Sequence, residues 1–148
     1  METLTKLVLC IILYSCCKET FARSTQRTYL DPTDPLCYSK DNENLLVYDE
    51  NGFVIEENEK VNELMRCQWE KNGVLCENGI DFYKLQRMLE AHLTGHYNNY
   101  IRTYLASKTI EDCYNVKGKN NGDTCVKLYN CLQKRLAANL KLLEDEAE

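Results

Sequence analysis

Apolar side chains recur every three or four residues through most of the chain from Glu56 onward, which is the spacing of one face of an α-helix. The pattern predicts a helix over residues 56–73 and a second over 80–93, with Gly73 and Gly95 suited to the helix ends. The side chains that share the inward faces of these two helices are Val61, Leu64, Met65, Trp69, Phe82, Leu85, Met88 and Leu89. Two amphipathic helices in succession favour a helical domain.

Three further helices are predicted toward the C-terminus. One covers residues 96–107, and a short one begins at Thr109, because Thr109 and Asp112 resemble a capping box. After the loop 115–123 (NVKGKNNGD), a long helix begins with Asp123 or Thr124 as its cap. The inward faces of the first and last of these helices carry Tyr97, Tyr100, Ile101, Tyr104, Leu105, Cys125, Leu128, Tyr129, Leu132, Leu136, Leu140 and Leu143.

Alternation typical of strands is confined to residues 45–54 (LLVYDENGFV), which form either a hairpin over residues 50–52 or a loop between helices. The predicted fold class is therefore all-α, a compact bundle of about five to six helices over residues 37–143. A polar segment, 23–36, holds both prolines and leads into this domain, and residues 144–148 (EDEAE) form a solvated, frayed acidic tail.

The N-terminus has the pattern of a secretory signal peptide. Lys6 precedes an apolar run over residues 7–17, and small residues before a break after Ala22 suit signal peptidase. The alternative, a membrane anchor, would need about 20 apolar residues. Cleavage after Ala22 predicts a secreted, extracellular product.

Cleavage also explains an odd cysteine count. The chain has nine cysteines, and three of them lie in residues 1–22. The remaining six are Cys37, Cys67, Cys76, Cys113, Cys125 and Cys131. An even set of cysteines in a secreted domain predicts three disulfides.

Charge and motifs exclude several classes of protein. Lys and Arg number 18 against 23 Asp and Glu, a net charge of -5, so the basic surface that binds nucleic acid or an anionic membrane is missing. No nucleophile motif, phosphate-binding glycine loop or free Cys–His arrangement is present, which indicates a protein that is not an enzyme and uses no cofactor.

His92 and His96 are the two histidines, four residues apart, a spacing that places two imidazoles on one helix face. A zinc site needs four ligands, and Gly95 interrupts the helix between them, so no metal is expected. The ten tyrosines leave another choice open: they belong either to a filled core or to the walls of a cavity for a small apolar ligand.

Two stretches around the cysteines resemble the insect odorant-binding (pheromone-binding) protein family. Residues 67–82 (CQWEKNGVLCENGIDF) are similar to the family's sequence from its third cysteine, with a glycine six residues on and a helix that starts at Asp81. Residues 110–129 are similar to the region of its fourth and fifth cysteines, here Cys113 and Cys125 with 11 residues between them. The resemblance covers roughly residues 37–140.

The chain departs from the family pattern at three positions. Glu63 stands where the family has its second cysteine, Lys134 stands where it has its sixth, and Cys131 comes one helical turn earlier. With Cys76 as a substitute, the resemblance implies the pairs Cys37–Cys67, Cys113–Cys131 and Cys76–Cys125. Pairing by order implies Cys37–Cys76, Cys67–Cys125 and Cys113–Cys131, and the choice stays open.

The resemblance implies a non-enzymatic carrier that binds a small hydrophobic or amphipathic ligand between its helices. The residues expected to line the pocket, chosen from helix phase, are Trp69, Phe82, Leu85, Met88, Leu89, Tyr100, Tyr104, Leu128, Leu132 and Leu136. Divergent relatives in the saliva of blood-feeding insects suggest the alternative, an effector that binds a host extracellular protein such as a receptor or protease through its surface. The oligomeric state is left open.

Overall fold

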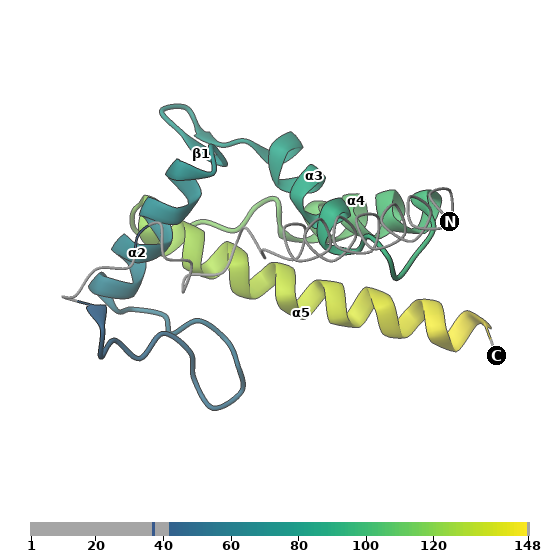
Figure 1. The fold of residues 1–148 in the computed structure, drawn as a ribbon, viewed down its shortest axis with the longest axis horizontal. Helices are drawn as coiled ribbons and strands as arrows, with labels where there is room; N and C mark the ends of the chain where they lie inside the picture. Colours follow the sequence, from purple (N-terminus) through teal and green to yellow (C-terminus); the bar gives the residue numbers. More distant parts are fainter. Residues whose placement is uncertain (1–36, 38–41, 148) are drawn as a thin grey trace, which may run out of the picture.

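The computed structural model describes Cys37 and residues 42–147. The predicted leader (1–22) and the polar segment (23–36) lie outside the described residues. Figure 1 shows the elements in chain order: α2 (Glu59–Lys71), β1 (Leu75–Cys76), β2 (Gly79–Ile80), α3 (Phe82–His92), α4 (Asn99–Cys113) and α5 (Asn121–Ala147).

The helices begin where a polar side chain caps the first turn. Asn58 accepts hydrogen bonds from the Lys60 and Val61 amides, Asp81 from Lys84, and Asn98 from Ile101. Such caps satisfy amides that have no partner inside the helix, so they fix the first residue of each helix. The predicted starts at residues 56, 80 and 96 therefore lie two or three residues too early.

One predicted boundary is wrong. The chain does not break between a helix over 96–107 and a short helix from Thr109, because α4 is continuous through this region. Thr109 is fully buried inside α4, where its hydroxyl accepts a hydrogen bond of 3.3 Å from Asn139 of α5. Four α-helices in the described residues replace the predicted five to six, and the all-α class is retained apart from one short hairpin.

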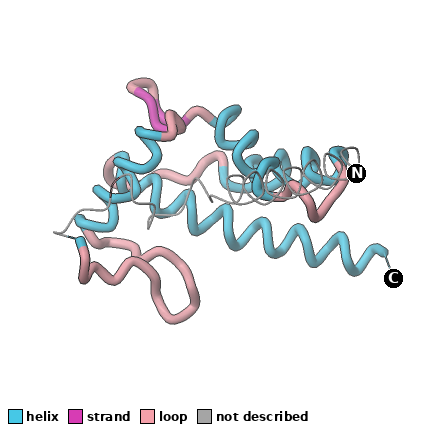
Figure 2. The backbone as a smooth tube through the Cα atoms, viewed as in Figure 1, coloured by secondary structure: helices cyan, strands magenta, loops and turns pink. Residues whose placement is uncertain are grey.

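A short hairpin lies between α2 and α3, and a loop precedes α2 (Figure 2). β1 and β2 form an antiparallel pair that the sequence pattern did not predict, and Gly79, the first residue of β2, has a φ of 104°. The segment 45–54 is a loop closed by one isolated bridge, Tyr48 to Val54. The side chain of Asn130 in α5 holds this loop. Its Oδ1 accepts from the Val54 N–H at 2.9 Å, and its Nδ2 donates to the Val54 carbonyl oxygen at 2.8 Å.

Helix α5 organises the core. It runs the length of the described fold in Figure 1 and packs against α2 and α4, while α3 packs against α4. The buried apolar cluster that results draws on all four helices and on the loop before α2. The predicted frayed tail is instead helical, since α5 continues to Ala147. No helix among the described residues is long and apolar enough to cross a membrane.

Candidate functional site

Two disulfides link parts of the fold: one joins Cys37, which precedes the helices, to α2, and the other joins α4 to α5. Cys37 is bonded to Cys67 of α2, and Cys113 at the end of α4 is bonded to Cys131 of α5. Both pairs are in the scheme that the family resemblance implies. Pairing by order is therefore wrong for Cys37 and Cys67.

The third predicted disulfide, Cys76–Cys125, is absent. Cys76 is an exposed thiol on β1, whereas Cys125 is buried in the core cluster, and both are free. The described cysteines therefore form two disulfides in place of the predicted three. Burial raises the pKa of the Cys125 thiol to about 12, so Cys125 stays protonated and unreactive.

Other side chains occupy the positions where the resemblance expects cysteines. Glu63 accepts hydrogen bonds from Arg66, which lowers the pKa of the Glu63 carboxyl. Lys134 lies over the ring of Phe53, with its Nζ atom 4.7 Å from the ring centroid. An ion pair and a cation–π contact thus stand in place of covalent links, and each is a weaker constraint than a disulfide.

Most of the predicted pocket residues belong to one apolar cluster between the helices. Five are buried members of it, namely Trp69, Leu85, Leu89, Leu128 and Leu132. Phe82 and Met88 of α3 pack against the cluster while half-buried, and Leu136 of α5 is also half-buried. The helix phase therefore identified the interior, while the contact of these residues with a ligand stays a prediction.

The prediction that Tyr100 and Tyr104 face inward is wrong. Tyr100 is 82% exposed and Tyr104 is 50% exposed. The buried face of α4 carries Leu105, Ala106, Thr109, Ile110 and Cys113. Because α4 continues past residue 107, its buried face is set by the contacts of Thr109 and Cys113, and this phase turns both tyrosines toward solvent.

An open pocket of about 360 Å³ lies beside the Cys37–Cys67 disulfide. Asn42 and residues 59, 60, 63 and 64 complete its lining, and none of the ten predicted pocket residues belongs to it. Its apolar floor is the disulfide and Leu64, and its charged rim is exposed. The pocket adjoins the apolar cluster that contains Trp69, because Leu64 belongs to that cluster and Cys37 packs against it.

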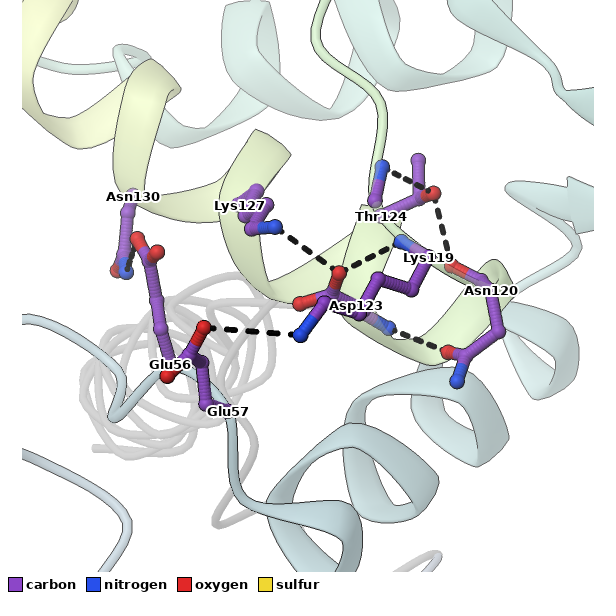
Figure 3. Close-up of polar contacts among 9 residues, drawn as sticks. Glu56, Glu57, Lys119, Asn120, Asp123, Thr124, Lys127 and Asn130 are labelled. Carbon is purple, nitrogen blue, oxygen red and sulfur yellow. Dashed lines mark hydrogen bonds and ion pairs between the residues drawn. The ribbon is translucent and has the colours of Figure 1, made fainter.

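The start of α5 carries a polar cluster around the buried Asp123 that the sequence pattern missed (Figure 3). Asn120 caps the helix, with its Oδ1 accepting from the Asp123 amide at 2.9 Å, so neither Asp123 nor Thr124 is the cap. Asp123 is 3% exposed and accepts from the Lys119 amide at 2.7 Å and from Lys127 Nζ at 3.0 Å. The spacing of Asn120 and Asp123 is the signal that would have located this cap.

These bonds make the stability of the protein depend on pH. The Lys119 amide and the Lys127 ammonium hold the pKa of the Asp123 carboxyl below its ordinary value near 4. A carboxyl with a lowered pKa stabilises the fold above about pH 4, and this contribution is lost as the pH falls through the folded-state pKa.

Asp123→Asn is therefore expected to lower the free energy of unfolding at pH 7 and to have a smaller effect at pH 3. The asparagine can still accept from the Lys119 amide but carries no charge for Lys127. Urea unfolding at both pH values measures the difference. Glu57→Gln is the matched control, because Glu57 and Lys119 form an exposed pair at 3.7 Å. An equal loss at both pH values for Asp123→Asn would contradict the assignment.

The two histidines do not share a helix. α3 ends at His92, Gly95 follows with a φ of 92°, and His96 lies beyond it, with both imidazoles exposed. Among the described residues, no group of three or more His, Cys, Asp or Glu side chains is placed to hold a metal ion.

Comparison with known families agrees with this arrangement of helices and disulfides. The model of the PBP/GOBP family, the insect pheromone- and odorant-binding proteins, matches residues 37–135, which is most of the described fold. The chain belongs to the PBP/GOBP family. Members of the PBP/GOBP family are small ligand-binding proteins, not enzymes, and they are typically secreted. No curated protein and no solved structure matches the chain.

Proposed function

We propose that this PBP/GOBP protein is secreted and binds one small hydrophobic or amphipathic molecule between its helices, to carry or sequester it without chemical change. The family match over residues 37–135 is the observation on which the proposal depends. Burial of apolar ligand surface, at about 25 cal/mol per Å², would supply most of the binding free energy. The leader pattern of residues 1–22 supports secretion.

The apolar cluster around Trp69 supports a site between the helices more than the open pocket does. It contains aromatic and aliphatic side chains from α2, α3, α4 and α5, whereas the pocket beside Cys37 is rimmed by charged, exposed side chains. Ligand sites are mostly apolar with few polar groups, and the cluster has that composition. Its five buried members named above, together with the half-buried Phe82, Met88 and Leu136, remain the candidate contacts.

Titration with the fluorescent apolar probe N-phenylnaphthylamine tests the proposal. We expect a saturable increase in probe emission with one site per chain, reversed by competing apolar compounds. Leu132→Asp places a charge in the cluster and should abolish binding. Leu142→Asp is the matched control, because Leu142 is an exposed leucine of the same helix. No saturable binding by a folded protein would overturn the proposal.

A second candidate is an effector in insect saliva that binds a host extracellular protein through its surface. The supporting observation is the exposure of large aromatic side chains, including Tyr83 of α3 at 76% and Tyr100 of α4. Tyrosine is enriched at protein interfaces, where its ring packs and its hydroxyl bonds. Expression in salivary glands together with no probe binding would favour this candidate, and probe binding abolished by Leu132→Asp would count against it.

A further inference from the structure

Trp69 has a hydrogen-bond donor with no acceptor. It is the single tryptophan of the chain, its side chain is 0% exposed, and its Nε1 atom has no hydrogen-bond partner among the described residues. A buried donor left without an acceptor costs about 1–3 kcal/mol, so native interiors contain few of them. Such a group calls for an explanation within the function of the protein.

The surroundings of Trp69 are apolar. Its cluster includes Met65 of the same helix, Leu85 and Leu89 of α3, and Leu128 and Leu132 of α5. Phe82 and Met88 pack against the cluster while half-buried, so the cluster reaches the surface along α3. An acceptor that met the indole N–H here would arrive on a molecule with an otherwise apolar body.

Arg102 Nε and Asn62 Oδ1 are also buried without a partner, but their settings differ from that of Trp69. Arg102 is half-buried, and its other guanidinium nitrogens bond Thr94 and Asn99. Asn62 lies where α2 crosses the start of α5. A Cβ atom added at Gly122 would be only 2.5 Å from the backbone carbonyl oxygen of Asn62. The backbones are in contact at this crossing, which leaves no room for a ligand. Trp69 is therefore the better candidate for a ligand contact.

We propose that the Trp69 indole N–H is the polar contact that orients the bound ligand, and that this ligand is a neutral apolar molecule with an acceptor oxygen, such as a ketone, ester or alcohol. This inference depends on the proposed function. The ligand is neutral because the apolar cluster around Trp69 contains no lysine, arginine or histidine. A carboxylate in this cluster would have no compensating charge.

A matched pair of ligands tests the inference. Methyl octyl ketone and n-decane have equal carbon counts and differ by one acceptor oxygen, and both are measured by displacement of N-phenylnaphthylamine. Trp69→Phe keeps an aromatic ring and removes the donor, so it should weaken ketone binding about tenfold and change decane binding less than about twofold. Met65→Leu is the control, because it alters packing in the same cluster and removes no donor.

A measurement on the unaltered protein serves if Trp69→Phe does not fold. With one tryptophan in the chain, the indole N–H gives one ¹H–¹⁵N resonance, and a new hydrogen bond moves it downfield. We expect the ketone to cause this shift and decane not to cause it. If both ligands displace the probe while the indole resonance stays in place, the inference is overturned and the proposed function stands. If neither ligand nor probe binds, the proposed function is overturned as well.

Discussion

Replacement of both Cys113 and Cys131 with alanine is expected to lower the free energy of unfolding by about 3 kcal/mol. The disulfide closes a loop of 18 residues, and its removal returns the entropy of that loop to the unfolded chain. It also joins the end of α4 to α5 at Cys113, which is fully buried in the core cluster. Urea unfolding under non-reducing conditions measures the change.

Cys76→Ala is the control for this prediction. Cys76 is an exposed free thiol, so its replacement should change the free energy of unfolding by less than about 0.5 kcal/mol. A loss of several kcal/mol in Cys76→Ala would show that Cys76 belongs to a third disulfide. A loss below about 1 kcal/mol in the Cys113 and Cys131 double variant would contradict the stabilising role of their bridge.

Helix periodicity in the sequence predicted many of the buried side chains. It did not predict features that depend on contacts between distant parts of the chain. Trp69, Leu85 and Leu128 are buried as their phase predicts, because a single amphipathic helix already fixes which face is apolar. The phase of a helix over residues 96–107 predicts Tyr100 and Tyr104 on the inward face, but the buried face of the longer α4 leaves both exposed. Thr109 lies inside the continuous helix α4, where it is buried against Asn139, 30 residues away in the chain.

The candidate site shows the same division. The family resemblance implies Cys37–Cys67, and both pairing schemes imply Cys113–Cys131. Neither scheme predicts that Cys76 on β1 and Cys125 on α5 are free. Nothing in the pattern of apolar residues distinguishes a tryptophan with a bonded indole from one without. The unpartnered N–H of Trp69 is a property of its neighbours in space.

Gly122→Ala is expected to destabilise the fold by about 1–3 kcal/mol, although alanine is the better helix former. Gly122 lies in the first turn of α5, where a helix-propensity argument predicts a gain of up to about 1 kcal/mol. The added Cβ would lie 2.5 Å from the Asn62 carbonyl oxygen and 2.8 Å from its carbonyl carbon. These are backbone atoms of α2, so the contact is relieved only if the two helices move apart.

Separation of α2 and α5 would loosen the cluster that contains Trp69, so Gly122→Ala should also weaken probe binding. Thermal unfolding and probe titration measure the two effects together. Asn121→Ala is the matched control, because Asn121 is exposed and precedes Gly122 in the same helical turn, so alanine there should leave stability unchanged or slightly raised. A Gly122→Ala protein as stable as Asn121→Ala would show that α2 and α5 do not meet at this backbone contact, and the placement of the Trp69 cluster between them would fail with it.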